Sequence, residues 1–216
     1  MKDKDYILSL IEQGEHEHQD FKYQISDARK IARSISAFAN HSGGHLLIGV
    51  KDNGSVAGVK SDEEMYMIEQ AAQLYCQPPQ KVIFTLYKVE GKSVLKADIA
   101  EATEKPVKAP DESGNWKTYF RVADENILAS AVHVKMLQHD SAEAGQSSVI
   151  TFSEREKTLM DYLSHHGGIT MNGLTRLIHC SRGTAAYLVV NLHDMGVIDV
   201  AYHNGNCLII EKDINN

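Results

Sequence analysis

The chain has 216 residues, of which 43% are hydrophobic and 24% are charged, the balance of an ordinary globular protein. Its length exceeds a typical single domain of about 100 to 150 residues, so we expect two domains. No stretch approaches the roughly 20 apolar residues of a membrane-spanning helix, and the start lacks a secretory signal, which predicts a cytoplasmic protein with no membrane partner. The net charge of −7 excludes a broadly basic surface, so a nucleic-acid site has to be a local patch.

The first part of the chain mixes both kinds of periodicity. Helical apolar spacing predicts helices over residues 5–13, 27–42, 61–76 and 129–137. Alternation or short apolar runs predict strands over residues 18–25, 45–52, 56–59, 82–89, 94–101 and 116–122. These patterns indicate an α+β protein whose N-terminal domain, residues 1–138, is a mixed α/β domain of ordinary size.

The pattern changes after residue 138. Residues 139–150 are mostly small and polar without periodicity, which predicts a linker. A Ser-x-x-Glu capping box at Ser153 begins the first of three short helices, over residues 153–166, 171–179 and 182–196. Two strands about Asn204-Gly205 follow. Three helices and a terminal hairpin predict a winged helix-turn-helix domain over residues 151–216.

An acidic stretch near the start, EHEHQDFK, carries the first candidate site. Glu15 and Asp20 would converge with Asp52 if the first strand pairs beside the strand that ends at Asp52. Three carboxylates suit a hard cation such as Mg²⁺ or Mn²⁺, and Lys22 would stabilise charge at a phosphate. The alternative is that these are solvated surface charges and that Asp52 serves only its turn.

The stretches EHEHQDFK, ISAFANHSGGHLLIGVKDNGSVAGV, KP at Lys105 and YFRV at Tyr119 together resemble the Schlafen-type AlbA-like domain. This domain is also described as divergent ATPase-like or DNA-binding, and the resemblance covers approximately residues 12 to 138. It implies an AlbA-like fold. In RNA-cleaving members of the family three acids form a metal-dependent nuclease centre, which would fall here on Glu15, Asp20 and Asp52, with Lys22 beside them. Asp20 stands where family sequences usually have glutamate.

The resemblance also implies a function in nucleic-acid binding. Many bacterial members carry a C-terminal winged helix and look like transcriptional regulators. Arg121 matches the arginine of the family's TyrIleArgVal strand and is a candidate phosphate contact, with a structural ion pair as the alternative.

In the C-terminal domain the recognition helix would begin at Arg182, because the second helix after the turn enters the major groove. Its outward residues and the tip of the hairpin supply the other candidate contacts to DNA: Ser181, Arg182, Thr184, Tyr187, Asn191, His203 and Asn204. The opposing interpretation is that winged helices often mediate protein pairing.

The sequence therefore predicts a bacterial nucleic-acid-binding protein, most specifically a DNA-binding transcriptional regulator. Winged-helix regulators and edge strands are both compatible with a homodimer. A Mg²⁺- or Mn²⁺-dependent endoribonuclease that acts on structured RNA is the alternative, and a non-catalytic protein-interaction module is the third interpretation.

Overall fold

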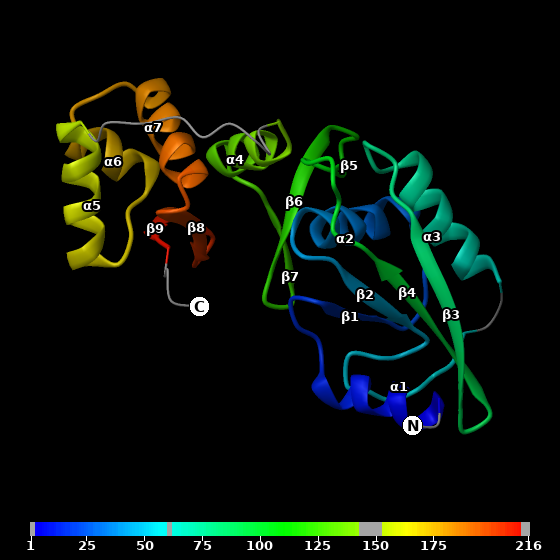
Figure 1. Cartoon of the computed structure of the whole chain (residues 1–216). Coiled ribbons are helices and arrows are strands. Elements are labelled where there is room, and N and C mark those ends of the chain that lie inside the picture. Colours follow the sequence, from blue (N-terminus) through cyan, green and yellow to red (C-terminus); the bar gives the residue numbers. More distant parts are fainter. Residues whose placement is uncertain (1–2, 60–61, 143–152, 213–216) are drawn as a thin grey trace. The chain divides into compact units, whose positions relative to one another are not determined.

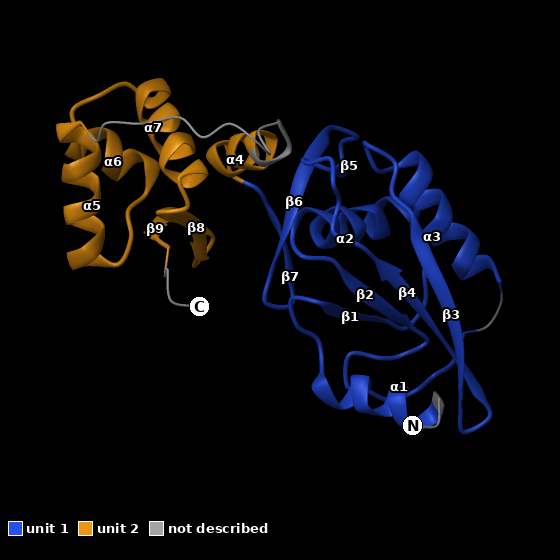
Figure 2. Cartoon of the chain, viewed as in Figure 1, with its two compact units in different colours: residues 1–129 blue, residues 130–216 orange. Residues whose placement is uncertain are grey.

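The computed structural model describes residues 3–59, 62–142 and 153–212. The chain divides into two compact units, residues 1–129 and residues 130–216 (Figure 2). Each unit contains helices and at least one sheet, which confirms the predicted α+β class with a smaller second domain. Within the described residues no helix has the length and apolar character needed to cross a membrane.

The first unit contains two sheets. Its elements are α1 (Asp3–Gln13), β1 (Gln19–Lys22), α2 (Ala28–Asn40), β2 (Gly44–Ile48), α3 (Glu63–Leu74), β3 (Val82–Val89), β4 (Lys92–Ile99), β5 (Lys108–Pro110), β6 (Trp116–Val122) and β7 (Glu125–Leu128). The larger sheet has the order β1-β2-β4-β3, in which only β1 and β2 are parallel. The smaller sheet has the order β5-β6-β7 and is antiparallel.

Helix α2 forms the centre of the first unit (Figure 1). Asp27 caps its N-terminus by accepting a hydrogen bond from the Arg29 amide. Apolar residues of α2 pack with residues from both sheets and from α3 in one core cluster. Helix α1 contributes Ile7 to a second cluster that includes Phe21 and Leu47. Because side chains alternate along a strand, Phe21 and Leu47 face α1, whereas Leu46 and Ile48 lie on the opposite face of the sheet and pack with α2.

Most predicted elements of this unit are present, and the exceptions are short. Residues 56–59 do not form the predicted strand: Val56 makes an isolated bridge with Val50, and the amides of Ala57 and Gly58 both donate to the Gly49 carbonyl instead of forming a ladder. Strands β5 and β7 were not predicted. They are three and four residues long, which is too short for alternation to identify them.

The second unit contains four helices and one hairpin among its described residues. These elements are α4 (Ala131–Ala142), α5 (Glu154–His166), α6 (Met171–Leu177), α7 (Arg182–Asp194), β8 (Ile198–His203) and β9 (Asn206–Glu211). The capping box at Ser153 and the left-handed Gly167 limit α5 as the sequence indicates. The Asn204-Gly205 turn joins β8 to β9, with positive φ at both residues.

Helix α4 lies in the second unit, whereas the sequence assigned residues 129–137 to the first domain. Val132 and Met136 pack in the same core as α5, α6 and α7. Tyr202 of β8 accepts a hydrogen bond from the Ser130 amide at 2.9 Å, and its hydroxyl lies 3.0 Å from His133 Nδ1. The division between the units therefore precedes α4. Residues 139–142 of the predicted linker belong to α4, and residues 143–150 lie outside the described residues.

Candidate acidic site and candidate nucleic-acid interface

Strand β1 places an acid and a lysine on the face of the sheet that α2 covers. Asp20 and Lys22 are two residues apart and therefore share a face of the strand. Asp20 is only 4% exposed, and its Oδ2 lies 2.7 Å from Lys22 Nζ. The lysine ammonium also donates a hydrogen bond to the Phe21 carbonyl at 2.9 Å. These two members of the predicted cluster form a close ion pair within one strand.

Glu15 joins this pair from the segment that precedes β1. Its Oε1 accepts a hydrogen bond from the Phe21 amide at 2.8 Å. Burial, followed by a hydrogen bond with the Asp20 carboxyl, raises the pKa of Glu15. The hydrogen bond from the Phe21 amide and the charge of Lys22 act in the opposite direction and lower the Glu15 pKa.

Arg121 enters the same site from β6 and is 1% exposed. Its guanidinium donates hydrogen bonds to the carbonyls of His16 and Gln19 at 3.3 and 3.2 Å and to Asn126 Oδ1 at 3.0 Å. Its Nη2 lies 3.8 Å from Asp20 Oδ1. Burial lowers the pKa of Arg121 and the Asp20 charge raises it.

This environment corrects the proposed contact between Arg121 and phosphate. Internal carbonyls and a carboxylate occupy the guanidinium, so it is not available at the surface. The alternative given by the sequence, a structural ion pair, matches the observed contacts.

Asp52 lies apart from this arrangement, in the exposed turn that follows β2. The register pairs Asp20 with Leu46, six residues before Asp52. Among the residues that the structure describes, no three His, Cys, Asp or Glu side chains are grouped so as to hold a metal ion. The fold thus brings Glu15, Asp20 and Lys22 together but does not add Asp52 to form the expected site for Mg²⁺ or Mn²⁺.

A histidine cluster beside this site was not predicted. The rings of His18 and His41 stack with centroids 5.5 Å apart, and His16 lies 6.1 Å from His18. His45 Nε2 lies 2.8 Å from Gln19 Oε1, and burial lowers the pKa of His45 to about 4. His18 and His45 line a cavity of about 430 Å³ with Lys81, Asp98 and Glu101. The sequence places His16 beside His18 and His41 near His45, but only the parallel pairing of β1 with β2 brings the two pairs together.

The adjacent glycine pair has a packing role. A Cβ on Gly44 would lie 2.4 Å from the Phe38 ring, and one on Gly43 would lie 2.9 Å from the Ile99 carbonyl oxygen. Asn40, four residues before Gly44, donates to the carbonyls of Val107 and Tyr119 at 2.8 Å. Residues 37–44 therefore hold α2 between the two sheets. Close packing accounts for both glycines without a bound phosphate.

In the second unit, α7 presents polar side chains on its outer face. Arg182, Thr184 and Tyr187 are exposed, and Tyr187 has 71% of its surface accessible. Asn191 is half-buried one turn later. The opposite face is buried in the core of the unit through Ala185, Leu188, Val189 and Leu192. The outward position predicted for Arg182, Thr184 and Tyr187 and the inward position predicted for Leu188, Val189 and Leu192 are confirmed, whereas Asn191 is less exposed than predicted.

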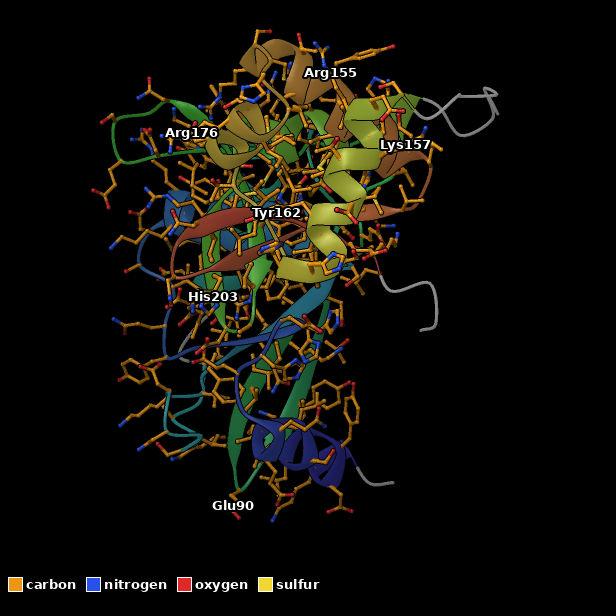
Figure 3. All side chains as sticks on the ribbon, turned by 90° about the vertical axis from the view of Figure 1, so that its left-hand side faces the viewer. Glu90, Arg155, Lys157, Tyr162, Arg176 and His203 are labelled. Carbon is orange, nitrogen blue, oxygen red and sulfur yellow. The ribbon has the colours of Figure 1, made fainter. Side chains whose placement is uncertain are left out.

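Two of the predicted contacts also serve local structure. Ser181 Oγ accepts a hydrogen bond from the Thr184 amide at 3.1 Å and lies 2.9 Å from the Thr184 hydroxyl, so it caps α7. Arg182 Nη1 donates to Asn172 Oδ1 of α6 at 3.1 Å. His203 and Asn204 are exposed at the tip of the β8–β9 hairpin (His203 is labelled in Figure 3).

The sequence around α6 and α7 is depleted of acids, a signal that the overall charge conceals. Residues 162–193 contain Arg176 and Arg182 and no aspartate or glutamate, although the whole chain has 29 acidic residues. Residues 162–193, which include α6 and all of α7 except its last residue, Asp194, are therefore a locally positive segment in an acidic chain.

These observations define a two-unit α+β protein with an internal charge cluster in the first unit and an outward polar helix in the second. The sequence model of the Schlafen AlbA_2 family matches residues 15–130, which is more than half of the chain. The protein belongs to this family.

Comparison with solved structures adds two similar folds. The DIP2311 protein of Corynebacterium diphtheriae aligns with 20% identity and a TM-score of 0.44, over 67% of this chain and 34% of that one. The chain thus spans about a third of that protein's length. The N-terminal domain of an ATP-dependent DNA helicase RecG-related protein from Nitrosomonas europaea aligns with 18% identity and a TM-score of 0.41, over 71% of this chain and 95% of that domain. No curated protein sequence matches the chain.

Proposed function

We propose that the protein binds nucleic acid and acts as a DNA-binding transcriptional regulator, with its second unit as a winged helix-turn-helix. The observation that carries this proposal is α7, which follows α6 after a short turn and exposes Arg182, Thr184 and Tyr187. In a helix-turn-helix the second helix places its N-terminal residues against base edges in the major groove. The match to the Schlafen AlbA_2 family covers most of the first unit, and membership of this family supports a nucleic-acid partner.

The charge distribution supports this placement despite the net charge of −7. Phosphate contacts provide much of the affinity of any DNA-binding surface, so acidic residues on it would be costly. Residues 162–193 supply two arginines without an acid, and Ser181 and Thr184 add hydroxyl groups at the helix start. Asn191 lies further along the same face. His203 and Asn204 would reach the backbone or minor groove from the hairpin. As a homodimer in a bacterial cytoplasm, the protein would present two such helices at half-sites about one helical turn apart.

Selection of binding sites from fragmented bacterial DNA, followed by titration of the selected duplex at two salt concentrations, tests this function. We expect affinity that falls with salt and at least a tenfold loss in Tyr187→Ala and in Arg182→Ala, on the scale of about 1 to 3 kcal/mol per specific contact. Tyr66→Ala and Arg155→Ala are matched controls, because these residues are exposed on α3 and α5. Equal effects of the α7 variants and the controls, or no salt-dependent binding, would exclude α7 as the recognition helix.

The endoribonuclease remains a second candidate, because Glu15, Asp20 and Lys22 lie together. The position of Asp52 in a separate exposed turn does not fit the metal site that this activity requires. Incubation of structured RNA with the protein, with and without Mn²⁺, decides between the two. Metal-dependent fragments that disappear in Glu15→Gln would favour the nuclease, whereas intact RNA in every lane favours a binding function. A non-catalytic protein-interaction module would bind neither DNA nor RNA.

A further inference from the structure

The outer edge of the larger sheet is strand β3, and the hydrogen-bond pattern shows which of its backbone groups point outward. The His45 amide donates to the His18 carbonyl, and the Gly49 amide donates to the Lys22 carbonyl. The backbone N–H and C=O groups of the odd-numbered residues of β2 therefore point toward β1. The even residues of β2 therefore face β4. They pair there with odd residues, as in Leu46 with Ala97.

It follows that the even residues of β4 face β3, where Lys96 pairs with Thr85 and Val94 pairs with Tyr87. The odd-numbered residues of β3 therefore form their backbone N–H and C=O hydrogen bonds with β4. The even residues direct theirs away from the sheet: Val82, Phe84, Leu86 and Lys88. Within the part of the chain that the structure describes, no backbone hydrogen bond reaches these outward groups.

This edge lacks the features that usually prevent sheet edges from pairing. Folded proteins protect such edges with charges, prolines, bulges or short strands. Strand β3 is eight residues long and has no charge or proline from Val82 to Tyr87. It also exposes 59% of Ile83 and 55% of Leu86. By contrast, the opposite edge strand β1 is four residues long and includes Asp20 and Lys22.

We propose that β3 pairs antiparallel with β3 of a second copy of this chain, about a two-fold axis that passes through Thr85. Because outward groups must meet outward groups, a two-fold pairing has to be centred on a residue and not between residues. Centring on Thr85 sets Phe84 opposite Leu86 and Ile83 opposite Tyr87. Each of these is an apolar cross-strand pair, and each covers a side chain that is exposed in the single chain.

The charges at the ends of β3 favour a second copy of the chain as the partner and favour the register centred on Thr85. Lys88 lies opposite Val82, and Lys81 lies opposite Val89, so no like charges face each other. Centring on Leu86 would instead place Lys88 opposite Phe84, inside the apolar pairing. The resulting dimer would have one continuous eight-stranded sheet from two four-stranded sheets.

The dimer gives the proposed regulator its second recognition helix, so it deepens that function, but it forms without DNA and can be measured alone. Sedimentation or light scattering of the full chain over a hundredfold concentration range is expected to show association to twice the chain mass of 24.0 kDa. Thr85→Lys places two ammonium groups opposite each other at the axis. We expect it to raise the dissociation constant of the dimer by about tenfold or more. Leu128→Lys, at an exposed residue of β7, is the matched control and should leave association unchanged.

Cysteine cross-linking tests the register. Thr85 forms a non-hydrogen-bonded pair with itself, in which Cα atoms are about 4.5 Å apart, within the range that a disulfide accepts. Thr85→Cys should therefore form a covalent dimer under mild oxidation by air. Ile83→Cys should form no more covalent dimer than the parent chain does, because the two copies of residue 83 are offset by four positions.

A monomer at every concentration would overturn the proposal. So would a dimer that survives Thr85→Lys, or cross-linking no greater for Thr85→Cys than for Ile83→Cys. A monomer that still binds the selected DNA would contradict the proposed dimer but not the proposed DNA-binding function. A dimer that binds no DNA would contradict the DNA-binding function but not the dimer.

Discussion

Strand β1 with its neighbours and helix α7 carry similar kinds of side chain and use them in opposite ways. In the first unit, Asp20, Lys22 and Arg121 meet beneath α2 and satisfy one another and nearby carbonyls. In the second unit, Arg182 and Tyr187 project from a helix whose other face is buried. The difference arises because a strand covered on both faces has no outer face, whereas a helix on a small core always has one. Charged residues in a motif therefore need not lie at the surface on which the protein acts.

The largest expected effect comes from breaking the internal cluster. Arg121→Met should lower the free energy of unfolding of the first unit by about 3 to 5 kcal/mol, because it leaves buried carbonyls and Asp20 without their donor. Chemical denaturation measures this loss. Arg182→Met is the matched control in the second unit and should change the free energy of unfolding by about 0.5 kcal/mol or less. A small effect of Arg121→Met would show that the cluster contributes little to the fold.

The pH dependence of stability sharpens the comparison further. The pKa of His45 falls from 6.5 in the unfolded chain to about 4 in the fold, so the folded state favours the neutral ring. The unfolded chain consequently binds a proton first as the pH drops. The contribution of the neutral His45 ring to the free energy of unfolding is complete above pH 6.5 and is lost as the pH falls toward 4.

Replacing this ring isolates its contribution. We expect wild type to lose about 2 kcal/mol more than His45→Gln between neutral and acidic pH, after allowance for partial solvent screening of the ring. Thermal denaturation of both proteins at several pH values measures the difference. Parallel pH profiles for the two would assign the acid sensitivity to other groups.

A smaller effect is expected at the start of α7. Ser181→Ala removes the oxygen that accepts the Thr184 amide, which should destabilise the second unit by about 1 kcal/mol. Ser181→Asp retains a capping oxygen and is the conservative control. If the units unfold in separate transitions, only the transition of the second unit should move. A shift in the transition of the first unit would contradict the division of the chain.

The smallest effect on stability is expected at the most exposed aromatic residue of the proposed interface. Tyr187→Ala should change the free energy of unfolding by about 0.5 kcal/mol or less, because the ring is 71% exposed. The same variant should weaken DNA binding, as proposed above. A large loss of stability would mean that Tyr187 serves the fold, and the loss of binding would then have a structural cause.

Local patterns in the sequence were sufficient for most helices and strands. Helical spacing located α2 and α7, and the alternation at 82–89 and 94–101 located the β3–β4 hairpin. The capping box at Ser153 and the Asn204-Gly205 turn were identified because their chemistry involves only neighbouring residues. The outward face of α7 followed from the same periodicity.

The sequence also indicated that Glu15, Asp20 and Lys22 belong together, since they lie within one short stretch. It did not determine the burial of Arg121, the separation of Asp52 from the other acids, or the assembly of four histidines. Each of these depends on which strands become neighbours and on which layer covers them. Strand pairing and layer packing join residues up to about a hundred positions apart, as in the contact of Arg121 with Gln19. Only the tertiary structure decides such contacts, because the free energy that selects them comes from burying whole faces of sheets and helices.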